Sequence, residues 1–223
     1  MIEILRDIFS RKPKLFAVFA FRYDAHLVPN LLIHLSGFID DYISFDDREN
    51  EAEWYHEGNI RNLLVEKARD AGADWVVCID PDERFEIKAG NQIRNLIRNK
   101  KKIIYGFRFR EMWTFDSYRI DGIWNSKTKF ILFPLLEGQR FRCLHVHSPW
   151  NPINNDYKKI LTNINLYHFK MINPDRREER RRIYNKLDPD HIIQKIGYDY
   201  LTDEAHLQLE KIAPDRVFFP EIK

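Results

Sequence analysis

A short apolar run that ends abruptly in carboxylates is the feature that most constrains the fold of this chain. Residues Trp75 to Ile79 are aromatic, β-branched or sulfur-containing, and no polar residue alternates between them. Such a run is typical of a strand that is covered on both faces, as in a parallel sheet between helices. Ligands of these sheets gather beyond the carboxyl ends of the strands. We therefore expect the acids that follow, Asp80 and Asp82, to lie at a site.

Asp80 and Asp82 are two residues apart, so an extended backbone would point both carboxylates the same way. Pro81 supports that conformation because it disfavours the α region for Asp80. Two carboxylates this close raise each other's pKa unless a cation neutralises them, and their hard oxygens suit Mg²⁺ or Mn²⁺. Substrate phosphates commonly fill the remaining positions of such an ion. The alternative is a solvated acidic turn that caps a following helix.

Strand-like and helical patterns alternate in the first half. The expected elements are Leu15 to Phe21, Leu27 to Gly37, Phe38 to Phe45, Asn59 to Ala71 and Trp75 to Ile79. This strand-helix-strand-helix-strand order indicates parallel pairing with right-handed crossovers, and thus an α/β, doubly wound sheet. All three strands end in acids.

The spacing of the apolar residues changes in the second half of the chain. Two strand-like runs, Ile104 to Trp113 and Ile123 to Phe133, lie on either side of a polar, turn-rich stretch. This pattern predicts an antiparallel excursion beside the parallel half, with a loop at its tip. A final strand is expected over Ile164 to Phe169, followed by a helical pattern over Asp175 to Tyr200 that Pro189 interrupts. No internal repeat or low-complexity linker is visible, so we expect a single domain over residues 1–223.

Charge and cysteine content exclude several classes of protein. The 36 basic and 34 acidic residues nearly balance, which argues against a general nucleic-acid binder. Basic residues are instead local, at Arg11 to Lys14, Arg98 to Lys102 and Arg176 to Arg182, where they suit an anionic membrane surface, a phosphate-bearing substrate or plain solvation. Two cysteines give neither a disulfide framework nor a zinc set.

The first ten residues, Met1 to Ser10, alternate charged with apolar side chains, which predicts a short amphipathic helix rather than a signal peptide. No apolar stretch approaches membrane-spanning length. We therefore expect a cytoplasmic protein. The helix permits peripheral contact at the inner membrane surface, and a packed terminal helix is the alternative.

Three segments in register resemble the family 2 glycosyltransferases of the GT-A fold. They are Leu15 to Asp24, the strand end Phe45 to Asp47, and Asn59 to Asn62 leading to Asp80-Pro81-Asp82. The resemblance implies a Rossmann-like, mostly parallel GT-A sheet. It implies that residues 1–100 bind the nucleotide sugar.

Residues 101–223 are similar, more loosely, to the bacterial lipopolysaccharide-core glucosyltransferase-like branch, which implies an acceptor-side half with C-terminal helices. Tyr118 to Trp124, Lys127 to Phe133 and Leu166 to Lys170 carry this similarity. The chain departs from the common pattern at Asp46 to Asn50, where many relatives have a small Gly-Ser turn. It also lacks an obvious Glu-Asp pair of the kind that often supplies the catalytic base.

The resemblance implies an inverting transfer of a sugar from a nucleotide-diphosphate sugar to a hydroxyl acceptor, either a surface glycan or a lipid-linked one. Mn²⁺ or Mg²⁺ would stabilise the departing diphosphate as a Lewis acid. We expect Asp82 to bind the metal directly, Asp80 to bind it through water or to bind the ribose, and His168 to contact the metal or the diphosphate. A satisfied structural histidine is the alternative for His168.

The other candidates follow from the same resemblance. The remaining nucleotide-sugar contacts are expected to be Arg22, Asp24, Asp46, Asp47, Arg61 and Trp124. Their alternatives are helix caps, surface arginines and a core aromatic residue. For the general base that takes the acceptor proton, the candidates are Glu111, Asp116 and Asp121, of which Asp121 is preferred. Glu111 would otherwise pair with Arg108 or Arg110.

Two other functions stay open. An acid cluster after a buried strand also serves metal-dependent phosphohydrolases, but here the motif follows the third strand and Glu83 succeeds Asp82. A GT-A-like module that binds a nucleotide sugar without turnover would explain the missing Glu-Asp pair.

Overall fold

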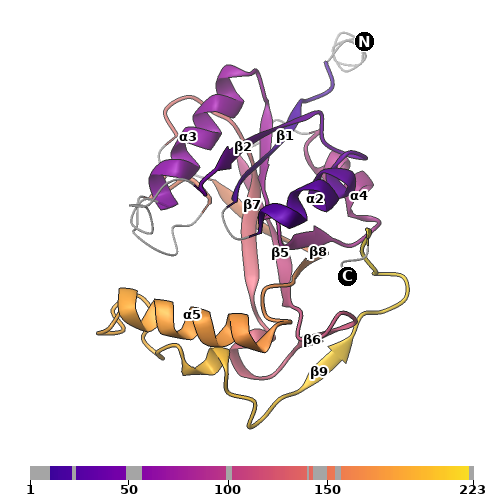
Figure 1. The fold of residues 1–223 in the computed structure, drawn as a ribbon. Helices are drawn as coiled ribbons and strands as arrows, with labels where there is room; N and C mark the ends of the chain where they lie inside the picture. Colours follow the sequence, from indigo (N-terminus) through magenta and orange to yellow (C-terminus); the bar gives the residue numbers. More distant parts are fainter. Residues whose placement is uncertain are drawn as a thin grey trace.

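The computed structural model describes residues 11–21, 24–48, 57–98, 102–139, 141–142, 150–153 and 157–220. These residues form an α/β fold around a seven-stranded mixed sheet with the strand order β2-β1-β3-β7-β5-β8-β4 (Figure 1). A two-stranded sheet, β6 with β9, lies beside it in the C-terminal part. The expected helix over Met1 to Ser10 lies outside the described residues.

The strands of the large sheet are β1 (Leu15–Phe21), β2 (Asp41–Asp46), β3 (Trp75–Cys78), β4 (Glu83–Phe85), β5 (Ile103–Glu111), β7 (Thr128–Pro134) and β8 (Lys158–His168). The small sheet consists of β6 (Ser117–Arg119) and β9 (Leu209–Lys211). The helices are α2 (Val28–Leu35), α3 (Glu57–Asp70), α4 (Ala89–Leu96) and α5 (Pro174–Leu187), with short 3₁₀ turns η1 (Ala25–Leu27), η3 (Gly122–Trp124) and η4 (Asp199–Leu201).

The first half of the sheet is parallel, as expected. Strand β1 pairs in parallel with both β2 and β3, so the carboxyl ends of these strands share one edge. All four residues of β3 are buried. Figure 1 shows the reason, because α3 covers one face of this part of the sheet while α2 and α4 cover the other.

The second half contains the expected antiparallel pairings. Strand β7 runs antiparallel to β3 and to β5, while β8 runs parallel to β5 and antiparallel to β4. The register aligns His168 of β8 with Glu111 of β5 on one side and with Glu83 of β4 on the other. Three charged side chains are thereby brought together at one end of the sheet.

Several element boundaries were predicted wrongly. The run expected from Ile123 to Phe133 begins with the turn η3, and the strand starts only at Thr128. Helix α5 ends at Leu187, in agreement with the interruption expected at Pro189, but residues 188–198 form turns instead of a further helix toward Tyr200. Strands β4, β6 and β9 and helix α4 were not predicted. The three-residue strands are too short to show a period, and two residues of β4 are charged.

None of the described helices has the length and apolarity needed to cross a membrane.

Gly106 in β5 provides a test of this packing. A Cβ atom there would lie 2.7 Å from the ring of Phe130 on β7, at a point where the pairing of β5 changes register. We expect Gly106→Ala to lower the free energy of unfolding by about 1–3 kcal/mol, because the ring has to move within a packed sheet. Gly37→Ala is the control, since no atom lies within 4 Å of its added Cβ. Urea denaturation measures both, and an equal effect of the two changes would contradict the packing.

Candidate functional site

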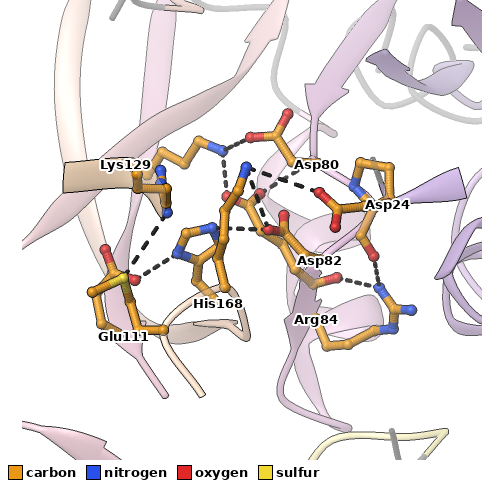
Figure 2. A network of polar contacts seen from close by, with 12 residues as sticks. Asp24, Asp80, Asp82, Arg84, Glu111, Lys129 and His168 are labelled. Atoms are coloured by element: carbon orange, nitrogen blue, oxygen red, sulfur yellow. Dashed lines mark hydrogen bonds and ion pairs between the residues drawn. The ribbon is translucent and has the colours of Figure 1, made fainter. Parts of the chain in front are cut away.

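The candidate site lies where β3 ends and the chain turns into β4. The Glu83 amide donates to the Asp80 carbonyl at 3.0 Å, and the Asp80 amide donates to Glu83 Oε2 at 3.0 Å. The strand geometry therefore does not persist through Pro81, because residues 80–83 form a tight turn. The turn gives Asp80 and Asp82 different partners, as Figure 2 shows.

Arg84 holds this turn from beneath. Its Nη1 donates to the carbonyls of Pro81 at 2.8 Å and Glu83 at 2.6 Å, and its Nη2 donates to the Leu27 carbonyl at 3.2 Å. The side chain is fully buried, and burial lowers the pKa of Arg84 to about 10. A buried guanidinium that binds carbonyls on both segments fastens the acidic turn to η1. Nothing in the sequence pattern distinguished this arginine from a surface arginine.

Lys129 supplies a cation to the first aspartate. Its Nζ donates to Asp80 Oδ2 at 2.8 Å and also to Glu83 Oε1. Burial lowers the pKa of Lys129, but the two carboxylates outweigh burial and raise it above its usual value. Burial raises the pKa of Glu83 to about 7. Burial would also raise the pKa of Asp80, yet the positive charge of Lys129 holds it below the usual value.

The second aspartate, Asp82, is buried beside two cationic side chains. Its Oδ2 lies 3.2 Å from His168 Nε2 and 3.9 Å from Lys170 Nζ. Burial would raise the pKa of Asp82, but these charges hold it well below its usual value. Neither contact has hydrogen-bond geometry, so Oδ2 is a buried acceptor without a hydrogen bond among the described residues. A water molecule or an ion would satisfy such an atom.

His168 lies between two carboxylates (Figure 2). Its Nδ1 donates to Glu111 Oε2 at 2.5 Å, while its Nε2 faces Asp82. Burial lowers the pKa of His168, but Glu111 and Asp82 outweigh burial and raise it to about 10.

Glu111 in turn accepts a hydrogen bond from Lys127 Nζ at 2.9 Å. Burial would raise the pKa of Glu111, but Lys127 and His168 hold it well below its usual value. Glu111 pairs with these two residues and not with Arg108 or Arg110, the partners that its strand position suggested.

Asp24 joins the site from the end of β1. Lys170 Nζ lies 3.8 Å from Asp24 Oδ2 and 3.9 Å from Asp82 Oδ2, so one ammonium serves two carboxylates. Burial, followed by repulsion from Asp82, raises the pKa of Asp24. Of the expected nucleotide-sugar contacts, Asp24 and Asp80 are thus at the site.

Two arginines lie near this acidic centre. Arg61 of α3 stacks over the ring of Trp150 at 4.5 Å, and its charge helps to lower the pKa of Asp80. Arg180 of α5 donates to the Tyr184 hydroxyl at 2.9 Å, and its charge acts on Asp82 and Glu111. Arg180 Nε is buried and makes no hydrogen bond within the described chain. Arg22 lies outside the described residues.

Other sequence candidates have different surroundings. Asp46 forms an exposed ion pair with Arg48 after β2, and the Asp47 amide donates to the Phe21 carbonyl at 2.9 Å. Asp121 accepts hydrogen bonds from the Arg119 side chain and the Gln208 amide, and no described contact joins it to Asp82.

Trp124 is buried in a cluster with Trp113, so it fills a core in this structure instead of offering a face to a sugar. Trp124 still has an indirect contact with the site, because Lys127 Nζ lies 4.0 Å from the centre of its ring. The same Nζ donates to Glu111, so Lys127 connects the aromatic cluster to the site.

The donor set fits a divalent ion only in part. No group of three His, Cys, Asp or Glu side chains converges as metal ligands in the described segments. Asp82 Oδ2 and His168 Nε2 are 3.2 Å apart, close to the spacing of adjacent ligands around an octahedral ion with bonds of about 2.1 Å. These two atoms could hold an ion whose other positions come from a diphosphate and water. Asp80 is instead engaged by Lys129.

Neither the known protein-family models nor the curated proteins contain a match to this sequence.

The raised pKa of His168 predicts how stability changes with pH. Its pKa is about 10 in the folded protein and 6.5 in an unfolded chain, so the stability from the charged ring is complete below pH 6.5 and disappears as pH rises through about 10. We expect the free energy of unfolding to fall across this window, by at most about 1.4 kcal/mol per pH unit from this group. His168→Gln should lack this component. Urea denaturation in a chelator measures both proteins, and parallel pH curves would refute the assignment.

Proposed function

We propose that this chain is a metal-dependent glycosyltransferase of the GT-A type, which moves a sugar from a nucleotide-diphosphate sugar to a hydroxyl acceptor with inversion. The observation that supports it most is the buried Asp82 Oδ2, which faces His168 and Lys170 without a hydrogen bond. This atom lies at the carboxyl edge of the parallel strands β2, β1 and β3, the edge at which α/β sheets bind ligands.

In this proposal Asp82 and His168 would hold Mn²⁺ or Mg²⁺, which, when bound, supplies Lewis-acid stabilisation of the departing diphosphate. Binding of the ion would displace the Nε2 proton of His168, and the charge of the ion would replace that of the ring beside Asp82. Lys170 and Arg180 would contact diphosphate oxygens, because both cations lie near Asp82 and Arg180 Nε has no hydrogen-bond partner in the described chain. Asp24 would bind the ribose or base. Asp80 would orient the donor through Lys129.

Glu111 has a positioning role in this proposal. A carboxylate that accepts from one ring nitrogen of a histidine fixes the tautomer and directs the other nitrogen toward a metal. Glu111 accepts from Nδ1, so Nε2 is directed toward Asp82. A carboxylate with a strongly lowered pKa is also a weak proton acceptor, which disfavours Glu111 as the acceptor base. The contacts of Asp121 with Arg119 and Gln208 favour a structural role for that residue.

A thermal-shift screen tests the donor site. We expect one nucleoside diphosphate to raise the melting temperature only with Mn²⁺, because a ligand of the folded state adds about 2.7 kcal/mol at a hundred times its Kd. Asp82→Asn should abolish this shift. Asp41→Asn should retain it, since Asp41 is an exposed carboxylate at the opposite end of β2.

Three other results would distinguish this proposal from a binding module and from a phosphohydrolase. The absence of any metal-linked shift with all common nucleotides would refute the donor site. A shift without sugar transfer or donor hydrolysis, across a panel of sugars and acceptors, would indicate a binding module. Phosphate release from simple phosphate esters would indicate a phosphohydrolase.

The role of Glu111 predicts a separate effect on the metal. We expect Glu111→Gln to weaken Mn²⁺ binding about 10–100-fold, since removal of a histidine's orienting carboxylate has this effect in metal sites. Glu86→Gln is a matched control, because Glu86 is similarly buried and ion-paired, but with Arg216. Calorimetric titration with Mn²⁺ measures both variants. Equal affinities in the two variants would remove Glu111 from the site.

A further inference from the structure

The loop that follows α5, residues 191–197, exposes three isoleucines close together in the chain. Ile192, Ile193 and Ile196 are between 44% and 77% exposed. Figure 1 shows α5 extending away from the large sheet, with this loop beyond its far end. Isolated apolar residues are common on protein surfaces, but several on one projecting loop form a patch that indicates an interaction site.

This loop has a defined shape although its isoleucines are exposed. The buried carboxylate of Asp188 accepts hydrogen bonds from the amides of Ile192 at 2.8 Å and Gln194 at 2.9 Å, and from the Tyr198 hydroxyl at 2.9 Å. At the other side of the loop the ring of His191 packs against Gly197. The isoleucines are therefore presented by an ordered backbone, and a partner would not have to meet the cost of ordering it.

The charge around the patch favours an anionic partner. Lys195 lies between Ile193 and Ile196, and Lys186 lies in the last turn of α5. Among the described residues neither lysine forms an ion pair. The arginines of α5 do not add to this charge, because each is ion-paired or buried in the described chain. Asp190, just before the loop, is the opposing charge, whereas the carboxylate of Asp188 is engaged by amides.

The kind of side chain favours a lipid surface over a protein. Protein interfaces are built around exposed aromatic residues and arginine. Here the nearest aromatic residue, Tyr198, is buried, and the exposed residues are aliphatic with lysines beside them. Aliphatic side chains enter the boundary between headgroups and acyl chains, while lysines extend to anionic headgroups.

We infer that residues 191–197 form a membrane-docking loop, which inserts Ile192, Ile193 and Ile196 into a bilayer that carries anionic phospholipids. This inference does not depend on the proposed transfer reaction. If both hold, docking through the loop brings the end of α5 to the membrane, where a lipid-linked acceptor would be found.

Co-sedimentation of the full chain with vesicles tests the loop. We expect binding to phosphatidylcholine vesicles that contain phosphatidylglycerol, and much weaker binding to phosphatidylcholine alone. The triple change of Ile192, Ile193 and Ile196 to serine should weaken binding at least about tenfold, since the variant has no aliphatic side chains to insert at these positions. The matched control changes three separate isoleucines to serine. These are Ile33, Ile87 and Ile153, which are between 53% and 58% exposed.

The control should bind vesicles like the unchanged chain. Thermal melting shows whether each variant is folded, and the single change Ile192→Ser at the most exposed position serves if the triple variant unfolds. The inference is overturned if the unchanged chain ignores anionic vesicles, or if the loop variant binds as well as the control. It is also overturned if sedimentation velocity shows a dimer that the loop variant abolishes, because the patch would then bind a second copy.

Discussion

One imidazole between two buried carboxylates holds the candidate site together. His168 contacts Glu111 through Nδ1 and Asp82 through Nε2, and so joins β5, β8 and the turn before β4. Burying two carboxylates is unfavourable without a cation, and removal of the cation leaves them uncompensated. The register that aligns Glu111, His168 and Glu83 across three strands therefore depends on a charge at the middle position.

The remaining charges of the site follow the same rule. Lys129 neutralises Asp80 and Glu83, and Lys170 lies between Asp24 and Asp82. The acidic cluster that the sequence displays as a run of carboxylates is thus a network in which each acid lies close to a cation. Among these carboxylates, Asp82 has the one described oxygen that is buried without a hydrogen bond. This oxygen is therefore the main support for an ion-binding site.

Local sequence patterns were enough to predict the parallel half of the sheet and the position of its acids. The apolar run from Trp75 onward identified a strand covered on both faces, and β1 and β3 were found nearly at their true bounds. The partners of the acids could not be predicted in this way. Lys129 reaches Asp80 because β7 inserts beside β3, and Glu111 meets His168 through the parallel register of β5 and β8. Such contacts depend on strand order, which no local pattern records.

The buried Arg84 has a consequence for how a substrate can enter. Its guanidinium donates to the carbonyls of Pro81 and Leu27, so the turn that carries Asp80 and Asp82 is fixed to η1. The segment after β8 is joined to the same turn, because the Phe169 amide donates to the Asp82 carbonyl at 2.9 Å. A substrate that enters therefore meets acids whose positions are already fixed on both sides. Its polar groups have to match the spacing of Asp80 and Asp82, because the turn cannot adjust to them without losing these hydrogen bonds.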